Sequence, residues 1–111
     1  LRYGRMIDAF ADMPKAQLGG ATYHWVHKSC QQFNYIFDNI DKIKTPFILF
    51  SAENEQIVHP YAHQRFVTAA KESGKECEAF EVENAQHELL IEKDEQRIAT
   101  INKTLDFYSK Y

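Results

Sequence analysis

Two short stretches of the sequence place acid and base side chains directly after apolar runs. The first run, Pro46–Phe50, leads into a turn that contains Glu53 and Glu55, and the second, Ala79–Val82, leads into a turn that ends in His87. A carboxylate on one ring nitrogen of a histidine fixes the tautomer of the ring and stabilises the imidazolium during proton transfer. These residues therefore indicate the acid and the base of a catalytic triad.

The nucleophile that would complete such a triad is missing from the sequence. In α/β-hydrolases the chain order is serine, acid, histidine, and the serine lies in a Gly-x-Ser-x-Gly turn. The serines and cysteines of this chain all lack glycine two residues away on either side: Ser29, Ser51, Ser73, Ser109, Cys30 and Cys77. We therefore expect the chain by itself not to perform this chemistry.

The residues alone leave open which of Glu53 and Glu55 is the acid. Both follow an apolar run at the position where open α/β sheets carry their ligand sites. The alternative is a pair of solvated loop charges, and for His87 it is a surface loop histidine. The apolar pair Ile57 and Val58, followed by a helix start at Pro60, favours an ordered and functional turn.

The other histidines are weaker candidates. His59 and His63 are four residues apart and can share a metal on one helix face, but no third ligand is evident, so we expect no metal site. We expect His59 to cap the helix instead. His24 and His27 flank Trp25, where packing or a lid role is the expected function.

Aromatic residues gather before the first apolar run: Tyr23, Trp25, Phe33, Tyr35 and Phe37. The ordinary interpretation is packing in a core or a cap. The functional alternative is an apolar wall for an acyl chain, because pockets for lipid-like ligands are lined in this way.

Composition excludes several classes of protein. The 111 residues are 44% hydrophobic and 26% charged, which is typical of a globular domain or part of one. The net charge of −3 and the absence of a basic block argue against a nucleic-acid partner. Cys30 and Cys77 match no metal or redox spacing and are expected to be free thiols in a reducing compartment.

Targeting signals are not evident either. No apolar stretch approaches the ~20 residues that span a bilayer, and no signal peptide is visible. We expect a cytoplasmic protein, or one held peripherally at the inner face of a bacterial membrane. The start at Leu1 suggests a processed product or an excised fragment.

The first part of the chain is expected to be helical. Residues 1–12 predict a short helix, and Pro14 with the Gly19–Gly20 pair predicts a loop. Residues 21–28 are hard to classify. From Ser29, as N-cap, the period is helical, with one stripe formed by Cys30, Phe33, Phe37 and Ile40.

After Pro46 strands and helices alternate. Strands are predicted at 47–50 and 79–82, and helices from Pro60 to Ser73 and from about Asp94 to Tyr108. The inward residues expected on the two helices are Phe66, Val67 and Ala70, and Ile98, Ile101, Leu105 and Tyr108. This β-α-β-α order predicts an α/β fold with a parallel sheet. Two strands make a poor sheet, so the domain is expected to be incomplete.

With both turns in view, the chain resembles the C-terminal part of α/β-hydrolases of the lysophospholipase L2 and monoacylglycerol lipase type. Pro46–Val58 is similar to the penultimate core strand and acid loop of that family, and this similarity selects Glu55 over Glu53. Asn84–Glu92 is similar to the family's Gly-Ala-x-His-Glu segment. Gly19–Val26 resembles a segment near the lid of the lysophospholipase L2 branch.

The resemblance spans nearly all 111 residues, but only about the last third of a full-length member. It implies that residues 1–45 are a lid or cap remnant with a connecting helix, and that residues 46–111 are the C-terminal portion of the hydrolase core. The chain departs from the family in its acid, which is glutamate rather than the commoner aspartate. Asn84 stands where the family often has glycine, and the nucleophile and oxyanion segments are absent.

The same resemblance implies a serine ester hydrolase that acts on a lysophospholipid or a monoacylglycerol. An upstream serine would attack the acyl carbonyl, His87 would carry the proton, and Glu55 would orient His87. This scheme requires no metal and no organic cofactor. The isolated chain is predicted to be inactive.

Two other interpretations stay open at this point. The chain can be a non-catalytic α/β interaction module that forms homo-oligomers through exposed strand edges, because unpaired edges invite pairing. It can also be a pseudo-enzyme that binds acyl lipids without turnover. Association with a membrane surface is open as well, although no amphipathic basic helix is evident.

Overall fold

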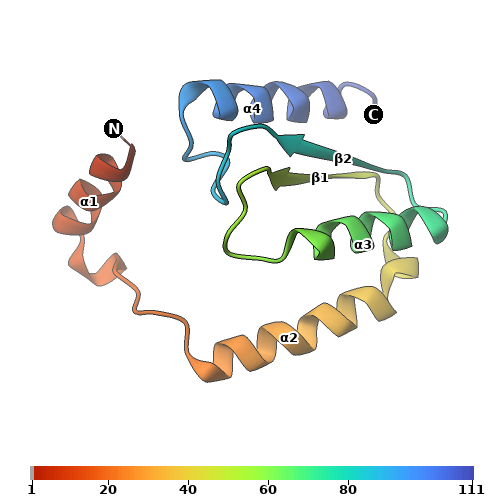
Figure 1. Ribbon diagram of the computed structural model, residues 1–111, viewed down its shortest axis with the longest axis horizontal. Helices are drawn as coiled ribbons and strands as arrows, with labels where there is room; N and C mark the ends of the chain where they lie inside the picture. Colours follow the sequence, from red (N-terminus) through yellow and green to blue (C-terminus); the bar gives the residue numbers. More distant parts are fainter. Residues whose placement is uncertain (1) are drawn as a thin grey trace. The chain divides into compact units, whose positions relative to one another are not determined.

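The computed structural model describes residues 2–111. It separates into two compact units, Leu1–Tyr35 and Ile36–Tyr111, which are described one at a time. The elements follow in the order α1 (Arg2–Asp12), a 3₁₀ turn (Pro14–Ala16), α2 (Tyr23–Asp38), a 3₁₀ turn (Ile40–Lys42), β1 (Phe47–Ala52), α3 (Pro60–Glu72), β2 (Cys77–Val82) and α4 (Asp94–Tyr108) (Figure 1).

Helix α2 begins earlier than the sequence predicted. The hydroxyl of Thr22 accepts a hydrogen bond from the N–H of Trp25 (3.1 Å), which caps the helix just before Tyr23. Ser29 is therefore not an N-cap; it lies inside the helix, and its hydroxyl donates to the carbonyl of Trp25 (3.0 Å). The prediction was wrong because a serine in the interior of a helix can donate its hydroxyl to the carbonyl four residues earlier.

The stripe expected on this helix is only partly present. Phe37 is half-buried and Ile40 is buried, but Cys30 and Phe33 are exposed. Ile40 belongs to the 3₁₀ turn that follows α2 rather than to the helix itself. The helix therefore has no continuous buried face along its whole length.

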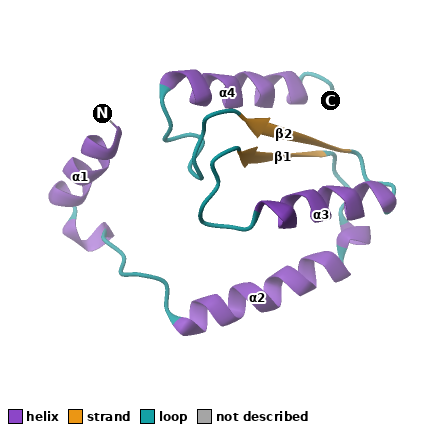
Figure 2. Ribbon diagram, in the orientation of Figure 1, coloured by secondary structure: helices purple, strands orange, loops and turns teal. Residues whose placement is uncertain are grey.

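The second unit is built around two parallel strands, as the sequence predicted. Phe47 lies opposite Cys77 and Ala52 lies opposite Val82, so the strands are in register over six residue pairs. Each strand is two residues longer than predicted. Strand β1 extends past the predicted range 47–50 to Ala52, and β2 begins at Cys77 rather than at Ala79. Both strands end on the same side of the pair, and α3 and α4 lie on opposite sides of it (Figure 2).

Local sequence accounts for both ends of α3. Pro60 occupies the first turn, and the Nδ1 atom of His59 accepts a hydrogen bond from the N–H of Tyr61 (3.3 Å), so His59 is the cap that the sequence predicted. The helix ends at Glu72, and Gly74 takes a φ of 71°. This left-handed conformation favours glycine, which has no side chain to clash with the backbone.

The predicted inward face of α3 is confirmed. Val67 and Ala70 are buried. The ring of Phe66 contacts the rings of Phe37 (5.9 Å between centroids) and Phe47 (5.6 Å). Helix α3 therefore packs its apolar side on β1 and on the end of α2.

The boundaries predicted for α4 are confirmed, but the predicted inward stripe is wrong. The stripe residues are all exposed: Ile98, Ile101, Leu105 and Tyr108. The buried residues lie on another face: Gln96, Thr100 and Phe107. Lys103 and Lys110 both pair with Glu78 on β2, the former at 3.0 Å, and these contacts favour the observed rotation of the helix.

A small apolar cluster lies where the two strands end. Ala52, Val82 and Ala85 are buried, and Phe50, Phe80 and Leu89 pack against them. Because this cluster joins both strands to the segment after β2, it anchors the two turns that carry the candidate site. No helix within residues 2–111 is both long enough and apolar enough to cross a bilayer.

Candidate active site

The turns after β1 and β2 are joined by backbone hydrogen bonds. The N–H of Glu53 donates to the carbonyl of Val82 (3.1 Å), and the N–H of Asn54 donates to the carbonyl of Ala85 (3.0 Å). The pairing of the two strands thus continues past their last residues. It holds the two turns side by side.

Glu55 and His87 meet between these turns. The Nδ1 atom of His87 lies 2.7 Å from Oε2 of Glu55, within the range of a short, charge-assisted hydrogen bond. The side chain of Glu55 is 3% exposed and that of His87 is 38% exposed. The acid is therefore enclosed, while the histidine keeps part of its ring open to the surroundings.

The second oxygen of Glu55 is occupied by its own turn. Oε1 accepts hydrogen bonds from the N–H groups of Ile57 (2.7 Å) and Val58 (3.3 Å). Burial raises the pKa of the Glu55 carboxyl, but the hydrogen bonds from His87 and from these two N–H groups outweigh burial and lower the pKa to about 2. Glu55 is therefore ionised at neutral pH.

The ionised carboxylate determines the state of the histidine. An ionised carboxylate only accepts hydrogen bonds, so Nδ1 of His87 must be the donor. In the neutral ring the proton then resides on Nδ1 and Nε2 carries the free lone pair. An imidazole oriented in this way can take a proton from a hydroxyl at Nε2 and can return it to a leaving group.

Glu53, the other acid of the turn, forms no hydrogen bond or ion pair with His87 in the described structure. Its Oε2 accepts a hydrogen bond from the backbone N–H of Asn84 (2.7 Å), and Asn84 has a φ of 54°. The geometry thus separates two acids that the residues alone left open. Glu55 reaches the histidine, and Glu53 reaches the backbone of the turn that carries it.

The structure adds one residue that was not singled out from the sequence. Oε1 of Glu92 accepts a hydrogen bond from the N–H of Gln86 (2.7 Å), directly before His87. No local pattern marks a carboxylate six residues after the amide that it binds. Only the folded path of residues 86–92 brings the two groups together.

The remaining histidines and both cysteines lie outside this arrangement. His59 caps α3, and Nδ1 of His63 is buried without a partner among the described residues. His24 and His27 are exposed on α2. Cys30 and Cys77 form no disulfide. Residues 2–111 hold no group of three side chains suited to bind a metal ion.

Comparison with known proteins is consistent with the geometry. The family model Hydrolase_4, described as serine aminopeptidase, S33, matches residues 1–94. Lysophospholipase L2 of Escherichia coli K12 is 32% identical over 113 residues, which cover 99% of this chain and 33% of that protein. Probable lysophospholipase L2 of Haemophilus influenzae is 33% identical over 99 residues, covering 86% of this chain and 30% of that protein.

The chain spans about a third of the length of these curated relatives. No solved structure gave a significant match. The family model covers most of the chain, and the parallel strand pair with its flanking helices agrees with the fold of that family. The chain therefore belongs to the serine aminopeptidase S33 family, which has the α/β-hydrolase fold.

Proposed function

We propose that this chain supplies the acid and the base of a serine ester hydrolase that acts on lysophospholipids or monoacylglycerols. The observation that carries the proposal is the 2.7 Å hydrogen bond between the enclosed Glu55 carboxylate and Nδ1 of His87. The substrate class is supported by relatives named lysophospholipase L2. The side chain of His87 is 38% exposed, which supports the approach of a reacting group to its ring.

The steps follow from the roles of the two residues. A serine hydroxyl from outside this sequence attacks the acyl carbonyl, and Nε2 of His87 takes its proton. His87 then gives this proton to the leaving alcohol, and the acyl-serine ester is hydrolysed by water that His87 activates in the same way. Glu55 stays ionised throughout and stabilises the imidazolium, as its low pKa requires.

The isolated chain is predicted to lack activity, because it contains no Gly-x-Ser-x-Gly turn. The test is to assay the purified 111-residue chain on a lysophospholipid and a monoacylglycerol, with and without a serine-directed probe. Turnover that the probe abolishes would contradict this part of the proposal. No labelling and no turnover is the expected result.

The catalytic roles are tested in the product of the complete reading frame that contains this sequence. In that protein, Glu55→Gln is expected to lower kcat by about 10⁴-fold and His87→Ala by about 10⁶-fold, the losses typical of a triad that lacks its acid or its base. Glu53→Gln keeps an acceptor oxygen for the N–H of Asn84 and is expected to retain most of kcat. If Glu53→Gln abolishes turnover and Glu55→Gln does not, the acid is Glu53.

The alternative is a non-catalytic α/β module that oligomerises through its strand edges and uncovered surfaces. Its support is the two-stranded sheet and the exposed apolar stripe on α4. The two candidates separate at the coding sequence before Leu1. Further strands and a nucleophile turn there would favour the enzyme, whereas an initiator codon at the start would favour the module.

Three further assignments belong to the same proposal. Residues 1–45 are a lid remnant with its connecting helix, and residues 46–111 are part of the hydrolase core. The exposed aromatics of α2, Tyr23 and Trp25, support a lid that faces lipid. The protein is cytoplasmic, or is held peripherally at the inner face of a bacterial membrane.

A further inference from the structure

The turn that carries His87 contains a residue in an unfavourable backbone conformation. Asn84 has a φ of 54°, in the left-handed region that residues with a side chain rarely adopt. Asparagine tolerates this region better than most residues, but glycine adopts it more easily. The turn therefore needs contacts that hold Asn84 in place.

Glu53 provides such a contact from the neighbouring turn. Its Oε2 lies 2.7 Å from the N–H of Asn84, and its own N–H donates to the carbonyl of Val82 (3.1 Å). Glu53 therefore binds the turn at two points. Its backbone binds Val82, before the left-handed residue, and its side chain binds Asn84 itself.

Glu92 binds the other side of the turn. Its Oε1 accepts from the N–H of Gln86 (2.7 Å), and its Oε2 accepts from the N–H of Lys93 (3.3 Å). Ala85, between the two bound amides, is 0% exposed, and its carbonyl accepts from the N–H of Asn54 (3.0 Å). Three consecutive residues before His87 are therefore held from three directions.

We propose that Glu53 and Glu92 are positioning residues, whose carboxylates clamp the backbone of residues 84–86 so that Nδ1 of His87 stays on Glu55. The inference rests on the proposed function for its catalytic meaning, but its geometry does not depend on turnover. Neither clamp carboxylate has a hydrogen bond to the imidazole in the described structure, and both act through the main chain.

The test measures the tautomer of His87 in the ¹⁵N-labelled 111-residue chain, at a pH where the imidazole is neutral. The nitrogen chemical shifts of the ring distinguish a proton on Nδ1 from a proton on Nε2. In the wild-type chain the Nδ1–H form is expected to predominate, because Glu55 accepts from that nitrogen. A predominant Nε2–H form in the folded wild-type chain would overturn the proposal.

The clamp variants come next. Glu53→Ala and Glu92→Ala are each expected to lower the ratio of Nδ1–H to Nε2–H about fivefold, the effect of one lost hydrogen bond on the balance. Glu53→Gln and Glu92→Gln remove the same charge but keep an acceptor oxygen, so the ratio is expected to persist. An unchanged ratio in both folded alanine variants, or an equal loss in the glutamine variants, refutes the clamp.

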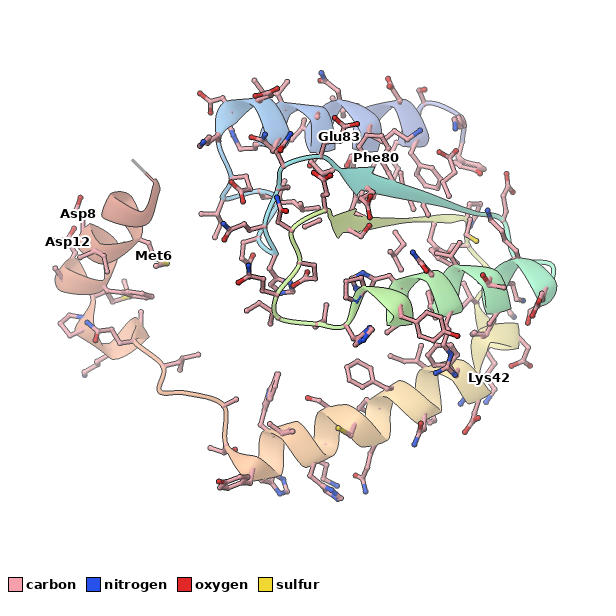
Figure 3. The ribbon with its side chains drawn as sticks, in the orientation of Figure 1. Met6, Asp8, Asp12, Lys42, Phe80 and Glu83 are labelled. Atoms are coloured by element: carbon pink, nitrogen blue, oxygen red, sulfur yellow. The ribbon has the colours of Figure 1, made fainter. Side chains whose placement is uncertain are left out.

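Glu83→Ala is the matched control. Glu83 is an exposed acid directly before Asn84, and it lies at the end of β2 (Figure 3). Its removal changes the charge of the turn as much as the clamp variants do. The tautomer ratio is expected to stay at the wild-type value, and a fall equal to that of Glu53→Ala would assign the effect to charge rather than to positioning.

A rescue keeps the test decisive if Glu53→Ala does not fold. Glycine at position 84 adopts the left-handed conformation without help, so Glu53→Ala combined with Asn84→Gly is expected to restore both the fold and the tautomer ratio. A double variant that folds but whose ratio of Nδ1–H to Nε2–H stays about fivefold below the wild-type value contradicts the proposal, as does one that stays unfolded.

The outcome is independent of the catalytic assignment. If the tautomer responds as expected but His87→Ala leaves the complete gene product active, the proposed function fails and the clamp stands. If His87→Ala abolishes turnover but neither clamp carboxylate affects the tautomer, the clamp fails and the function stands.

Discussion

Glu55 is stable as a buried charge because both oxygens of its carboxylate are hydrogen-bonded. Its two oxygens accept three hydrogen bonds, from His87 and from the N–H groups of Ile57 and Val58. Burial of an unpaired carboxylate would cost several kcal/mol, of the order found for isolated buried ions. At the scale of one residue, the turn that follows β1 is shaped to keep this group ionised.

This ionisation predicts how stability depends on pH. The pKa of Glu55 is lowered in the folded chain to about 2 from 4.5, so its contribution is complete above pH 4.5 and is lost as the pH falls toward about 2. Glu55→Gln cannot make this contribution. The difference in urea midpoint between wild type and Glu55→Gln is therefore expected to be largest near neutral pH and to shrink on acidification.

Asp106→Asn serves as the control variant, because the side chain of Asp106 is exposed on α4. Its variant is expected to follow the wild-type curve through the acidic range. A difference between wild type and Glu55→Gln that stays constant from neutral pH to about pH 2 would show that Glu55 contributes no titrating stability.

At the scale of an element, α4 shows that the boundaries of a helix can be predicted correctly while its buried face is predicted wrongly. Its length and first-turn acids, Asp94 and Glu95, were readable from local sequence. Its buried face was not, because Phe107 is buried while the more numerous apolar residues of the stripe stay exposed. Contacts with Glu78, a residue of another element, accompany the observed rotation.

The two faces make different predictions for stability. Phe107 is 4% exposed, so Phe107→Ala is expected to lower the free energy of unfolding by about 3–5 kcal/mol. Leu105 is 61% exposed, so Leu105→Ala is expected to change it by no more than about 0.5 kcal/mol. Urea unfolding of both variants measures the two losses in free energy. A larger loss for Leu105→Ala than for Phe107→Ala would show that the face predicted from the sequence is the buried one.

At the scale of the whole molecule, the described chain leaves much apolar surface uncovered. The exposed large residues include several on α2 and the stripe on α4, and the sheet has only two strands. Contiguous apolar surface on a folded protein marks an interaction site. We therefore expect these surfaces to pair with further protein, either another copy of the chain or other segments of the proposed hydrolase.

Self-association is the measurable consequence for the isolated chain. Sedimentation velocity over a range of concentrations is expected to show reversible oligomers. Leu105→Lys is expected to weaken them about tenfold, the value of one leucine removed from an apolar contact. Ala99→Lys adds the same charge at an exposed position of α4 outside the stripe and is expected to leave association unchanged.

A strictly monomeric wild-type chain at all concentrations would contradict this prediction. Equal weakening by both lysine variants would assign the effect to net charge rather than to the stripe. The first result would also remove the support for a module that oligomerises, whereas the second would remove only the role of the stripe.

Much of the fold was predictable because its signals are local. The strands followed from apolar runs, the start of α3 from His59 and Pro60, and its end from Gly74. The start of α2 was missed because Thr22 caps it before an aromatic segment that has no clear period. Extra strand residues were missed because pairing with a neighbour, rather than apolar character, extends a strand to Cys77 or Ala52.

The candidate site divides in the same way. The sequence by itself determined that an acidic turn and a histidine turn follow two successive strands, because each strand and the turn after it are adjacent along the chain. Only the tertiary structure decided that Glu55 reaches His87 while Glu53 and Glu92 bind the backbone before it. The physical reason is that these contacts join groups up to 32 residues apart, and their geometry depends on the register of two parallel strands and on one left-handed residue.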